Sequence, residues 1–518
     1  MTRDHAARVR AAELVGAISL ATDLGTGQPL EHALRTAVLA VRLAELAGAS
    51  PEELRDTYYV ALLHASGCTS NGHEATQFFG EDIEHRAAFF LVDPADVNQV
   101  VAFYRAHVAP GRAPEVREQM VEAALSSPER AADSFAAMCE VAQRFAGWLA
   151  LGGGIEASLE FVFARWDGRG WPKGIGAEDL PFPARALHVA RDFSLFLTAG
   201  GHDDARAVLE RRAGEAYEPR LVDLALGGFD DVLSELDETQ MWAHALDAEP
   251  FPHIYLADDG VDSGFGAVAA LTNLKSPWWR EHSTNVADLA EAAAWRLELP
   301  AETVAVLRRA SLAHDLGRVG VSNAIWEKAG PLGFGEWERV RLHTHFTERA
   351  FAQSPTLASI GRLAGSHHER LDGSGYHRGV RWPSLELPER ILAAADCYSA
   401  MCEARPHRPA LDPEAAQAEL TREATEGRLD RDAVAAVLAA AGHQFTIRSR
   451  ELPAGLTRRE LEVLLALVVG QSNQAIADSL GISAKTVGHH VQHVYQKAGV
   501  RSRAAATVWA FENELVHR

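Results

Sequence analysis

Two stretches of this chain repeat the same residues at a fixed distance. His32 in LEHALRTAVLAVRLAELAG is matched by His282 in REHSTNVADLAEAAAWRLE, and His64 in YVALLHASG is matched by His314 in RASLAHDLG. Both pairs are separated by 250 residues (282 − 32 and 314 − 64). Each copy continues into a similar loop, WDGRGWPKG in the first and LDGSGYHRG in the second. Self-similarity of this kind indicates two copies of one domain.

Apolar residues recur three and four positions apart through most of the chain, as in ADLAEAAAWRLEL, and alternating strand patterns are scarce. We therefore predict an all-α fold: two tandem helical bundles followed by a four-helix C-terminal domain. The length of 518 residues exceeds what a single core sustains. The predicted parts are a first copy at 1–227, a linker at 228–263, a second copy at 264–442, a linker at 443–455 and a C-terminal domain at 456–518.

The second copy contains a set of candidate metal ligands. Imidazole and carboxylate groups suit divalent Fe, Mn and Zn-like ions, and two such ions close together can clamp a phosphate group and activate water. Seven candidates are more than one tetrahedral zinc uses, so we predict two divalent ions. The alternative is a set of scattered surface histidines. The candidate ligands are His282, His314, Asp315, His343, His367, His368 and Asp396.

The motifs HDLG at 314–317 and HHERLDGSGYHRG at 367–379 resemble the HD-GYP branch of the HD phosphohydrolase family. The resemblance covers about residues 265–440. It implies an HD-type helical bundle, a two-metal site on these seven ligands, and hydrolysis of a cyclic dinucleotide such as cyclic di-GMP. It also implies that Asp315 and Arg318 are catalytic and that Arg318, Arg405 and Arg408 bind substrate phosphate. For Arg405 and Arg408 the alternative is a solvated surface position.

The sequence departs from the family pattern at two places. His377 replaces the proline of the Gly-Tyr-Pro motif, which removes a rigid residue from the loop. Trp278 stands where some members have a glutamate that recruits a third metal. We therefore expect two metal ions and not three.

The first copy lacks most of the metal-ligand pattern. His32, His64 and Asp192 remain, but Ala65 follows His64 and Val162 and Phe163 replace the adjacent histidine pair. The best match to His343 falls near Met138. We predict that this copy is not catalytic. It serves either as the structural half of a pseudo-twofold unit, which we expect, or as a sensor of a ligand or partner.

The C-terminal segment predicts four short helices. Thr457 and Glu460 form a capping-box pattern, and the apolar residues of the third helix follow 4-3-4 spacing. A helix, a glycine-containing turn and a helix with a polar outer face are typical of a helix-turn-helix. Because small amphipathic bundles share this periodicity, the pattern alone leaves a generic interaction module possible.

The same segment closely resembles the LuxR/FixJ/GerE family, through LTRRELEVL and SNQAIADSLGISAKTVGHHVQHVYQKAGVRSRAAA. The resemblance implies binding of double-stranded DNA and a homodimer on two half-sites. Phosphate contacts are implied for Lys485, Thr486, His490 and Lys497, and base contacts for Val487 and His489.

The charge distribution is consistent with a DNA-binding tail on a body that DNA repels. The whole chain has a net charge of −21, yet residues 446–518 contain nine Lys and Arg against six Asp and Glu. No apolar run is long enough for a membrane span, and the four cysteines form no CxxC pair, so we expect a cytoplasmic protein without membrane contact.

The sequence therefore predicts a DNA-binding transcription regulator that carries a metal-dependent phosphodiesterase acting on a phosphate-containing small molecule. The first alternative is a transcription factor that senses metal or nucleotide without turnover. A further alternative is a phosphohydrolase whose tail only contacts proteins.

Overall fold

The computed structural model describes residues 8–235, 238–444, 453–480, 482–513 and 515. Throughout these ranges the regular elements are helices, and the only extended pairings are three isolated β-bridges. The all-α prediction is confirmed. Much of the predicted linker at 443–455 lies outside the described residues.

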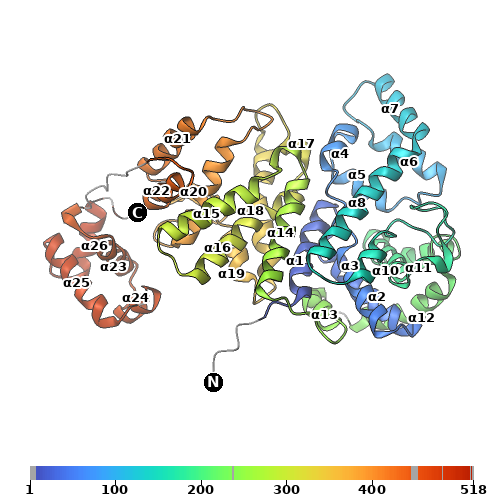
Figure 1. Cartoon of the computed structure of the whole chain (residues 1–518), viewed down its shortest axis with the longest axis horizontal. Helices are drawn as coiled ribbons and strands as arrows, with labels where there is room; N and C mark the ends of the chain where they lie inside the picture. Colours follow the sequence, from blue (N-terminus) through green and yellow to red (C-terminus); the bar gives the residue numbers. More distant parts are fainter. Residues whose placement is uncertain (1–7, 236–237, 445–452, 481, 514, 516–518) are drawn as a thin grey trace.

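The first copy consists of long helices around a buried centre, with short 3-10 turns (η) between them (Figure 1). Its elements are α1 (Ala11–Gly25), α2 (His32–Ala47), α3 (Pro51–Leu63), α4 (Gly72–Phe79), α5 (Glu84–Phe90), α6 (Val97–His107), α7 (Pro114–Ser126), α8 (Pro128–Trp148), α9 (Gly153–Leu159), η1 (Ala177–Asp179), α10 (Phe182–Gly200), α11 (His202–Arg212), α12 (Pro219–Glu235), η2 (Glu238–Gln240) and α13 (Met241–Asp247).

The second copy repeats this order with fewer elements. They are α14 (Asp258–Leu274), η3 (Pro277–Trp279), α15 (His282–Arg296), α16 (Ala301–Ala313), η4 (Leu316–Gly320), α17 (Asn323–Trp326), α18 (Phe334–Ala352), α19 (Ala358–Ala364), α20 (Leu387–Cys402), α21 (Pro413–Thr425) and α22 (Arg431–Ala440).

The repeated histidines fall at the same structural positions in both copies. His32 begins α2 as His282 begins α15. His64 directly follows α3 as His314 directly follows α16. The extra residues of the first copy form α4 to α7, of which α6 and α7 project at the top of Figure 1.

The two copies pack through their first helices, in a reciprocal arrangement. Helix α1 of the first copy contacts α18 and η4 of the second, and α14 of the second contacts α8 of the first. One continuous apolar core runs through both copies. The predicted linker at 228–263 contains the end of α12, α13 and the start of α14, and its Phe229, Met241 and Trp242 belong to that core. This segment is thus part of the folded body, because its apolar side chains are buried there.

A buried ion pair joins the copies beside η4. Lys275 Nζ lies 2.7 Å from Asp82 Oδ2 and donates to the carbonyl oxygen of Val319 at 2.9 Å. The second oxygen of Asp82 accepts from the backbone N–H of Asn323 at 2.7 Å. The first copy therefore supports the loop that follows His314 and Asp315.

The C-terminal domain consists of η5 (Pro453–Gly455), α23 (Arg458–Val468), α24 (Asn473–Leu480), α25 (Ala484–Ala498) and α26 (Arg503–Glu512), drawn in red in Figure 1. Thr457 Oγ1 accepts from the backbone N–H of Glu460, and the Glu460 carboxylate accepts from the backbone N–H of Thr457, so the predicted capping box is present. None of the helices in the described part of the chain combines the length and the apolar character that a membrane crossing requires.

Candidate metal centre and nucleic-acid interface

The seven predicted ligands converge in the second copy from five different places in its fold. His282 starts α15, His314 and Asp315 follow α16, His343 lies in α18, the pair His367 and His368 follows α19, and Asp396 lies in α20. Six of the seven are buried, and His368 is partly exposed. The structure brings together residues up to 114 positions apart (396 − 282).

Asp315 lies at the centre of this cluster. Its Oδ2 is 3.4 Å from His282 Nε2 and 3.1 Å from His314 Nε2. Its Oδ1 is 3.5 Å from His343 Nε2 and 3.4 Å from His367 Nε2. Each oxygen thus faces a different pair of imidazoles, which is the arrangement a carboxylate needs to bridge two cations.

Asp396 forms a second link across the cluster. Its Oδ1 is 3.3 Å from His282 Nε2, and its Oδ2 is 3.8 Å from His368 Nδ1. Two compact ligand groups result, each with its donor atoms within 4.8 Å of one another: His282, His314 and Asp315, and His343, His367 and His368.

Backbone carbonyl groups fix the orientation of three of these imidazoles. The Nδ1 atoms of His314, His343 and His367 each contact the carbonyl oxygen three residues earlier, at Ser311, Val340 and Ala364. An Nδ1–H bound in this way leaves Nε2 with its lone pair toward the cluster, which is how histidines are prepared as metal ligands.

Several atoms at the centre are buried without a hydrogen-bond partner. They are His282 Nε2, His314 Nε2, both carboxylate oxygens of Asp315 and Asp396 Oδ1. Because unpaired buried polar atoms cost free energy, this convergence of donor atoms fits divalent cations coordinated by imidazole and carboxylate.

The protonation of three of the imidazoles also suits cation binding. Burial, with the neighbouring His367, lowers the pKa of His343 to about 3, and burial lowers the pKa of His367 and His368 as well. These imidazoles are neutral at physiological pH. Burial acts against the ionised form of Asp315, but the nearby guanidinium of Arg318 holds its pKa well below the usual range.

Arg318 is held beside the centre between two tryptophan rings. Its Nη1 lies 2.8 Å from Asp315 Oδ2, and its guanidinium carbon is 5.1 Å from the ring centre of Trp279 and 5.2 Å from that of Trp326. Cation–π contacts of this kind hold a guanidinium in place while leaving edge donors available. Arg318 thus lies directly beside the candidate metal ligands, and its role in binding phosphate stays a prediction.

Arg405 and Arg408 lie in different environments. Arg405 donates to Trp278 O at 3.0 Å and pairs with Glu403 at 2.7 Å; burial and the neighbouring Arg318 cation lower its pKa to about 10. Arg408 instead donates to the carbonyl oxygens of Ala400, Met401, Glu403 and Pro409. The phosphate contact expected of Arg408 does not agree with this geometry, because its donors cap the end of α20.

Some of the predicted DNA-binding residues are exposed, and others are buried or paired within their own domain. Lys485, Thr486 and His489 are exposed on α25, and His490 is partly exposed. Val487 is fully buried in a core with Val463 and Ile476, so the base contact expected for it is wrong: the residue belongs to the apolar stripe of its helix. Lys497 differs as well, because its Nζ pairs with Glu460 at 2.6 Å and donates to Gly455 O.

Comparison with protein families identifies both parts. Residues 267–433 match the HD domain family, and residues 454–510 match the family of bacterial regulatory proteins of the LuxR type. The chain combines an HD domain with a LuxR-type regulatory domain. The HD match includes all seven clustered ligands, and the LuxR-type match includes the whole of α25.

Relatives of the HD domain are named as cyclic dinucleotide phosphodiesterases. The 3'3'-cGAMP-specific phosphodiesterase 3 of Vibrio cholerae is 27% identical over 406 residues, which cover 77% of this chain and 88% of that protein. A cyclic di-GMP phosphodiesterase of Thermotoga maritima is 33% identical over 129 residues, covering 24% of this chain and 35% of that protein.

A solved structure has the same fold over most of the chain. The crystal structure of a cyclic GMP-AMP specific phosphodiesterase of Vibrio cholerae matches with a TM-score of 0.60 and 24% identity, and the match covers 84% of this chain and 98% of that one. This match is too long for the HD domain alone, so it extends into the first copy.

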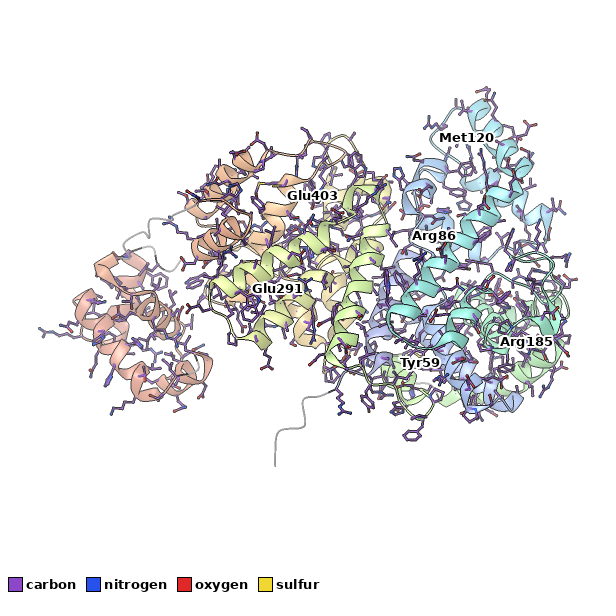
Figure 2. The ribbon with its side chains drawn as sticks, viewed as in Figure 1. Tyr59, Arg86, Met120, Arg185, Glu291 and Glu403 are labelled. Carbon is purple, nitrogen blue, oxygen red and sulfur yellow. The ribbon has the colours of Figure 1, made fainter. Side chains whose placement is uncertain are left out.

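The structure adds site residues that the sequence analysis missed. Glu403 contacts His282 Nδ1 at 3.1 Å and accepts from Ser399 Oγ at 2.9 Å, so it orients a predicted metal ligand (Figure 2 labels it in the second copy). Burial acts against a charged His282, yet the neighbouring carboxylates of Asp315, Asp396 and Glu403 raise its pKa to about 10. Asp396 and Ser399 lie three residues apart in α20 and Glu403 directly follows the helix, four residues after Ser399, a spacing that was present in the sequence.

The loop of the GYP-type motif packs directly against the ligands. Tyr376 lies with its ring centre 4.8 Å from that of His368. A Cβ at Gly375 would lie 2.4 Å from the carbonyl oxygen of His368, so only glycine fits there. His377, at the proline position, contacts Thr344 Oγ1 at 3.0 Å and Glu348 at 3.2 Å. The loop is therefore held by polar contacts in place of proline rigidity.

The first copy keeps the scaffold of the HD domain without its ligand set. His64 Nδ1 contacts the carbonyl oxygen of Ala61 at 2.7 Å, as His314 contacts Ser311, and the rings of His32 and His64 are 6.2 Å apart. Asp192 accepts from Tyr217 at 2.6 Å and pairs with Arg191 at 2.8 Å. In this copy the carboxylate is neutralised by protein groups.

Proposed function

We propose that the HD domain is a metal-dependent phosphodiesterase for a cyclic dinucleotide, and that the LuxR-type domain binds DNA in the same chain. The observation that carries the proposal is Asp315, whose two oxygens face two separate groups of neutral or hydrogen-bonded imidazoles. Such a site suits two divalent cations, and the names of the relatives supply the substrate class.

Different residues would bind the cations and the substrate phosphate. His282, His314, His343, His367, His368, Asp315 and Asp396 would hold the cations, which polarise a phosphodiester and activate water when bound. Arg318 and Arg405 would offset the charge of the phosphate. Burial and the neighbouring Arg318 cation lower the pKa of Arg405, and a bound anion would relieve the repulsion between the two guanidinium groups.

Glu403 would position His282, because its carboxylate contacts the Nδ1 atom on the side away from Asp315. Trp279 and Trp326 would keep Arg318 directed toward the centre. Both roles concern orientation and require no movement of the fold.

DNA binding is proposed for the outer face of α25. Lys485, Thr486 and His489 are exposed there, while Val487 and Val494 anchor the helix to its domain. A helix supported in this way can enter the major groove. A homodimer on two half-sites belongs to the same proposal.

The test is hydrolysis of cyclic di-GMP and of 3'3'-cGAMP by the full chain supplied with Mn²⁺ or Fe²⁺. We expect a linear dinucleotide from at least one substrate, none from Asp315→Ala, and none after chelation. Tight binding of either substrate by the metal-loaded chain without any product would support a sensor that does not turn over, and would refute the hydrolase.

A further inference from the structure

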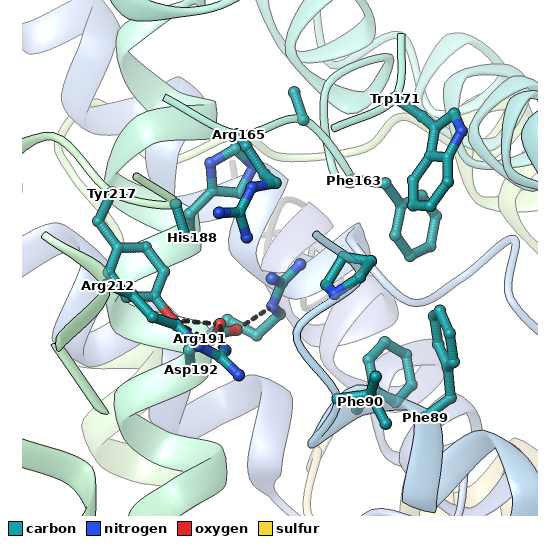
Figure 3. A pocket seen from close by; sticks show the side chains of 14 residues that line it. Phe89, Phe90, Phe163, Arg165, Trp171, His188, Arg191, Asp192, Arg212 and Tyr217 are labelled. Atoms are coloured by element: carbon teal, nitrogen blue, oxygen red, sulfur yellow. Dashed lines mark hydrogen bonds and ion pairs between the residues drawn. The ribbon is translucent and has the colours of Figure 1, made fainter. Parts of the chain in front are cut away.

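The first copy contains a cavity lined by cations and aromatic rings (Figure 3). Its volume is about 60 Å³. Of the described residues that line it, Asp192 is the only acid. The cations are Arg165, Arg191 and Arg212, and the rings are those of Phe89, Phe90, Phe163, Trp171, His188 and Tyr217.

The cavity lies beside the position that corresponds to the metal centre of the HD domain. Asp192 corresponds to Asp396 and Phe163 to His368. Arg191 takes the place of Ala395, its Nε donates to Asp192 at 2.8 Å, and its Nη1 donates to the carbonyl oxygen of Val162 at 3.0 Å. A fixed guanidinium thus stands at the position where the second copy has the small apolar side chain of Ala395.

A smaller space lies between Arg191 and the remaining histidines. A separate cavity of about 10 Å³ is lined by His32, His64 and Arg191, which is room for about one water. Burial, with Arg191 adding to the effect, lowers the pKa of His64 to about 4. The positive charge of the first copy is therefore supplied by the protein and directed toward the larger cavity.

The three arginines bring guanidinium groups to the cavity wall, each with an acidic partner. Arg165 is paired with Asp93 at 2.6 Å and Asp167 at 3.0 Å. Arg212 lies 3.5 Å from Asp192 and 3.5 Å from Asp93, and it donates to Tyr217 Oη at 3.4 Å. In Figure 3 the guanidinium of Arg191 points to the middle of the cavity, between Arg165 and the ring of Phe90. An oxyanion there would accept hydrogen bonds from buried guanidinium groups, which suit phosphate geometrically.

We propose that this cavity binds the phosphate group of a nucleotide and does not hydrolyse it. The volume of about 60 Å³ is roughly four times what one water needs, which matches a phosphate group with its four oxygens. The partly exposed rings of Phe89, Phe90 and Trp171 form an aromatic rim on which a base can stack. Hydrolysis is excluded because the ligands matching Asp315, His367 and His368 are Ala65, Val162 and Phe163.

The experiment measures nucleotide binding to the full chain. A chelator removes metal ions, which stops the proposed hydrolysis by the HD domain. Equilibrium dialysis with labelled cyclic di-GMP, GMP and inorganic phosphate distinguishes a cyclic dinucleotide, a mononucleotide and a free anion. We expect a nucleotide to bind without metal. Arg191→Gln should weaken this binding about tenfold or more, since it removes a charged hydrogen-bond donor, and Arg191→Lys should restore part of it.

Two further variants separate loss of the site from loss of folding. Trp171→Leu leaves the buried ion pairs in place and should weaken nucleotide binding more than phosphate binding. Arg144→Gln, on the exposed surface of α8, and Arg318→Gln, in the HD domain, should leave the metal-independent binding unchanged. The proposal is overturned if neither nucleotide binds without metal, if only inorganic phosphate binds, or if Arg191→Gln in a folded chain binds as tightly as the original. Because no hydrolysis is measured, failure here leaves the proposed activity of the HD domain unaffected.

Discussion

The two copies share a scaffold and differ in what surrounds the carboxylate that both retain, Asp396 in the HD domain and Asp192 in the first copy. In the HD domain, Asp315 and Asp396 face imidazoles, and several of the converging atoms lack protein partners. In the first copy, Asp192 is satisfied by Arg191 and Tyr217. The duplicated helical frame keeps the same Nδ1-to-carbonyl contact at His64 and His314, while the carboxylate that faces imidazoles in the HD domain is paired with an arginine in the first copy.

The largest difference between the copies is expected when the corresponding histidine, His314 or His64, is replaced in each copy. His314→Ala should abolish metal-dependent hydrolysis, with a loss greater than the roughly 10- to 100-fold typical of groups outside the ligand set. His64→Ala should leave metal content and hydrolysis intact, because Ala65, Val162 and Phe163 already preclude a metal site there. Assays of both variants with cyclic di-GMP and 3'3'-cGAMP check this, and equal losses in the two variants would contradict the division of roles.

A large effect on stability is expected at the ion pair between the copies. Lys275→Met leaves Asp82 charged and buried, which should cost about 3–5 kcal/mol in the free energy of unfolding. Asp82→Leu combined with Lys275→Met should recover much of this. Urea unfolding followed by tryptophan fluorescence measures both, with Arg42→Met, in an exposed pair, as the control that should change stability by less than about 1 kcal/mol. A single variant as stable as the original chain would show that the pair does not join the copies energetically.

A smaller effect is expected from Glu403, which has no acidic counterpart in the first copy, where Ala199 stands. Glu403→Gln should lower metal affinity or hydrolysis about 10- to 100-fold, since it weakens the contact that orients His282. Metal titration and hydrolysis assays measure this. Glu338→Gln, in an exposed pair on α18, is the matched control. An unchanged metal affinity and rate would remove Glu403 from the site.

The smallest effect concerns the LuxR-type domain. Lys485→Ala should weaken DNA binding and lower the dependence of log affinity on log salt by about one, because one phosphate contact is lost. Lys497→Ala should change that slope less, because Lys497 is already paired with Glu460. Fluorescence anisotropy at several salt concentrations distinguishes the two, and equal changes in slope would restore the predicted phosphate contact of Lys497.

The sequence predicted the duplication, the all-α class and the convergence of seven ligands, because helical periodicity and rare residue types are local signals. It did not predict the orientation of side chains whose sequence position fits more than one structural role. Val487 fits both a buried stripe and a recognition helix, and Arg408 both a phosphate site and a helix end; only the packed structure distinguishes these. The role of Arg191 was equally hidden, because an arginine adjacent to an aspartate is common and its direction depends on Val162, 29 residues earlier.

The central claim is that Asp315 links two cations in the second copy alone. The most direct test is the metal-to-protein ratio of the full chain after Mn²⁺ loading and gel filtration, measured by inductively coupled plasma mass spectrometry. We predict two ions per chain, retained in His64→Ala and lost in Asp315→Ala. A chain that takes up no metal, or an Asp315→Ala variant that still holds two ions, would contradict the account.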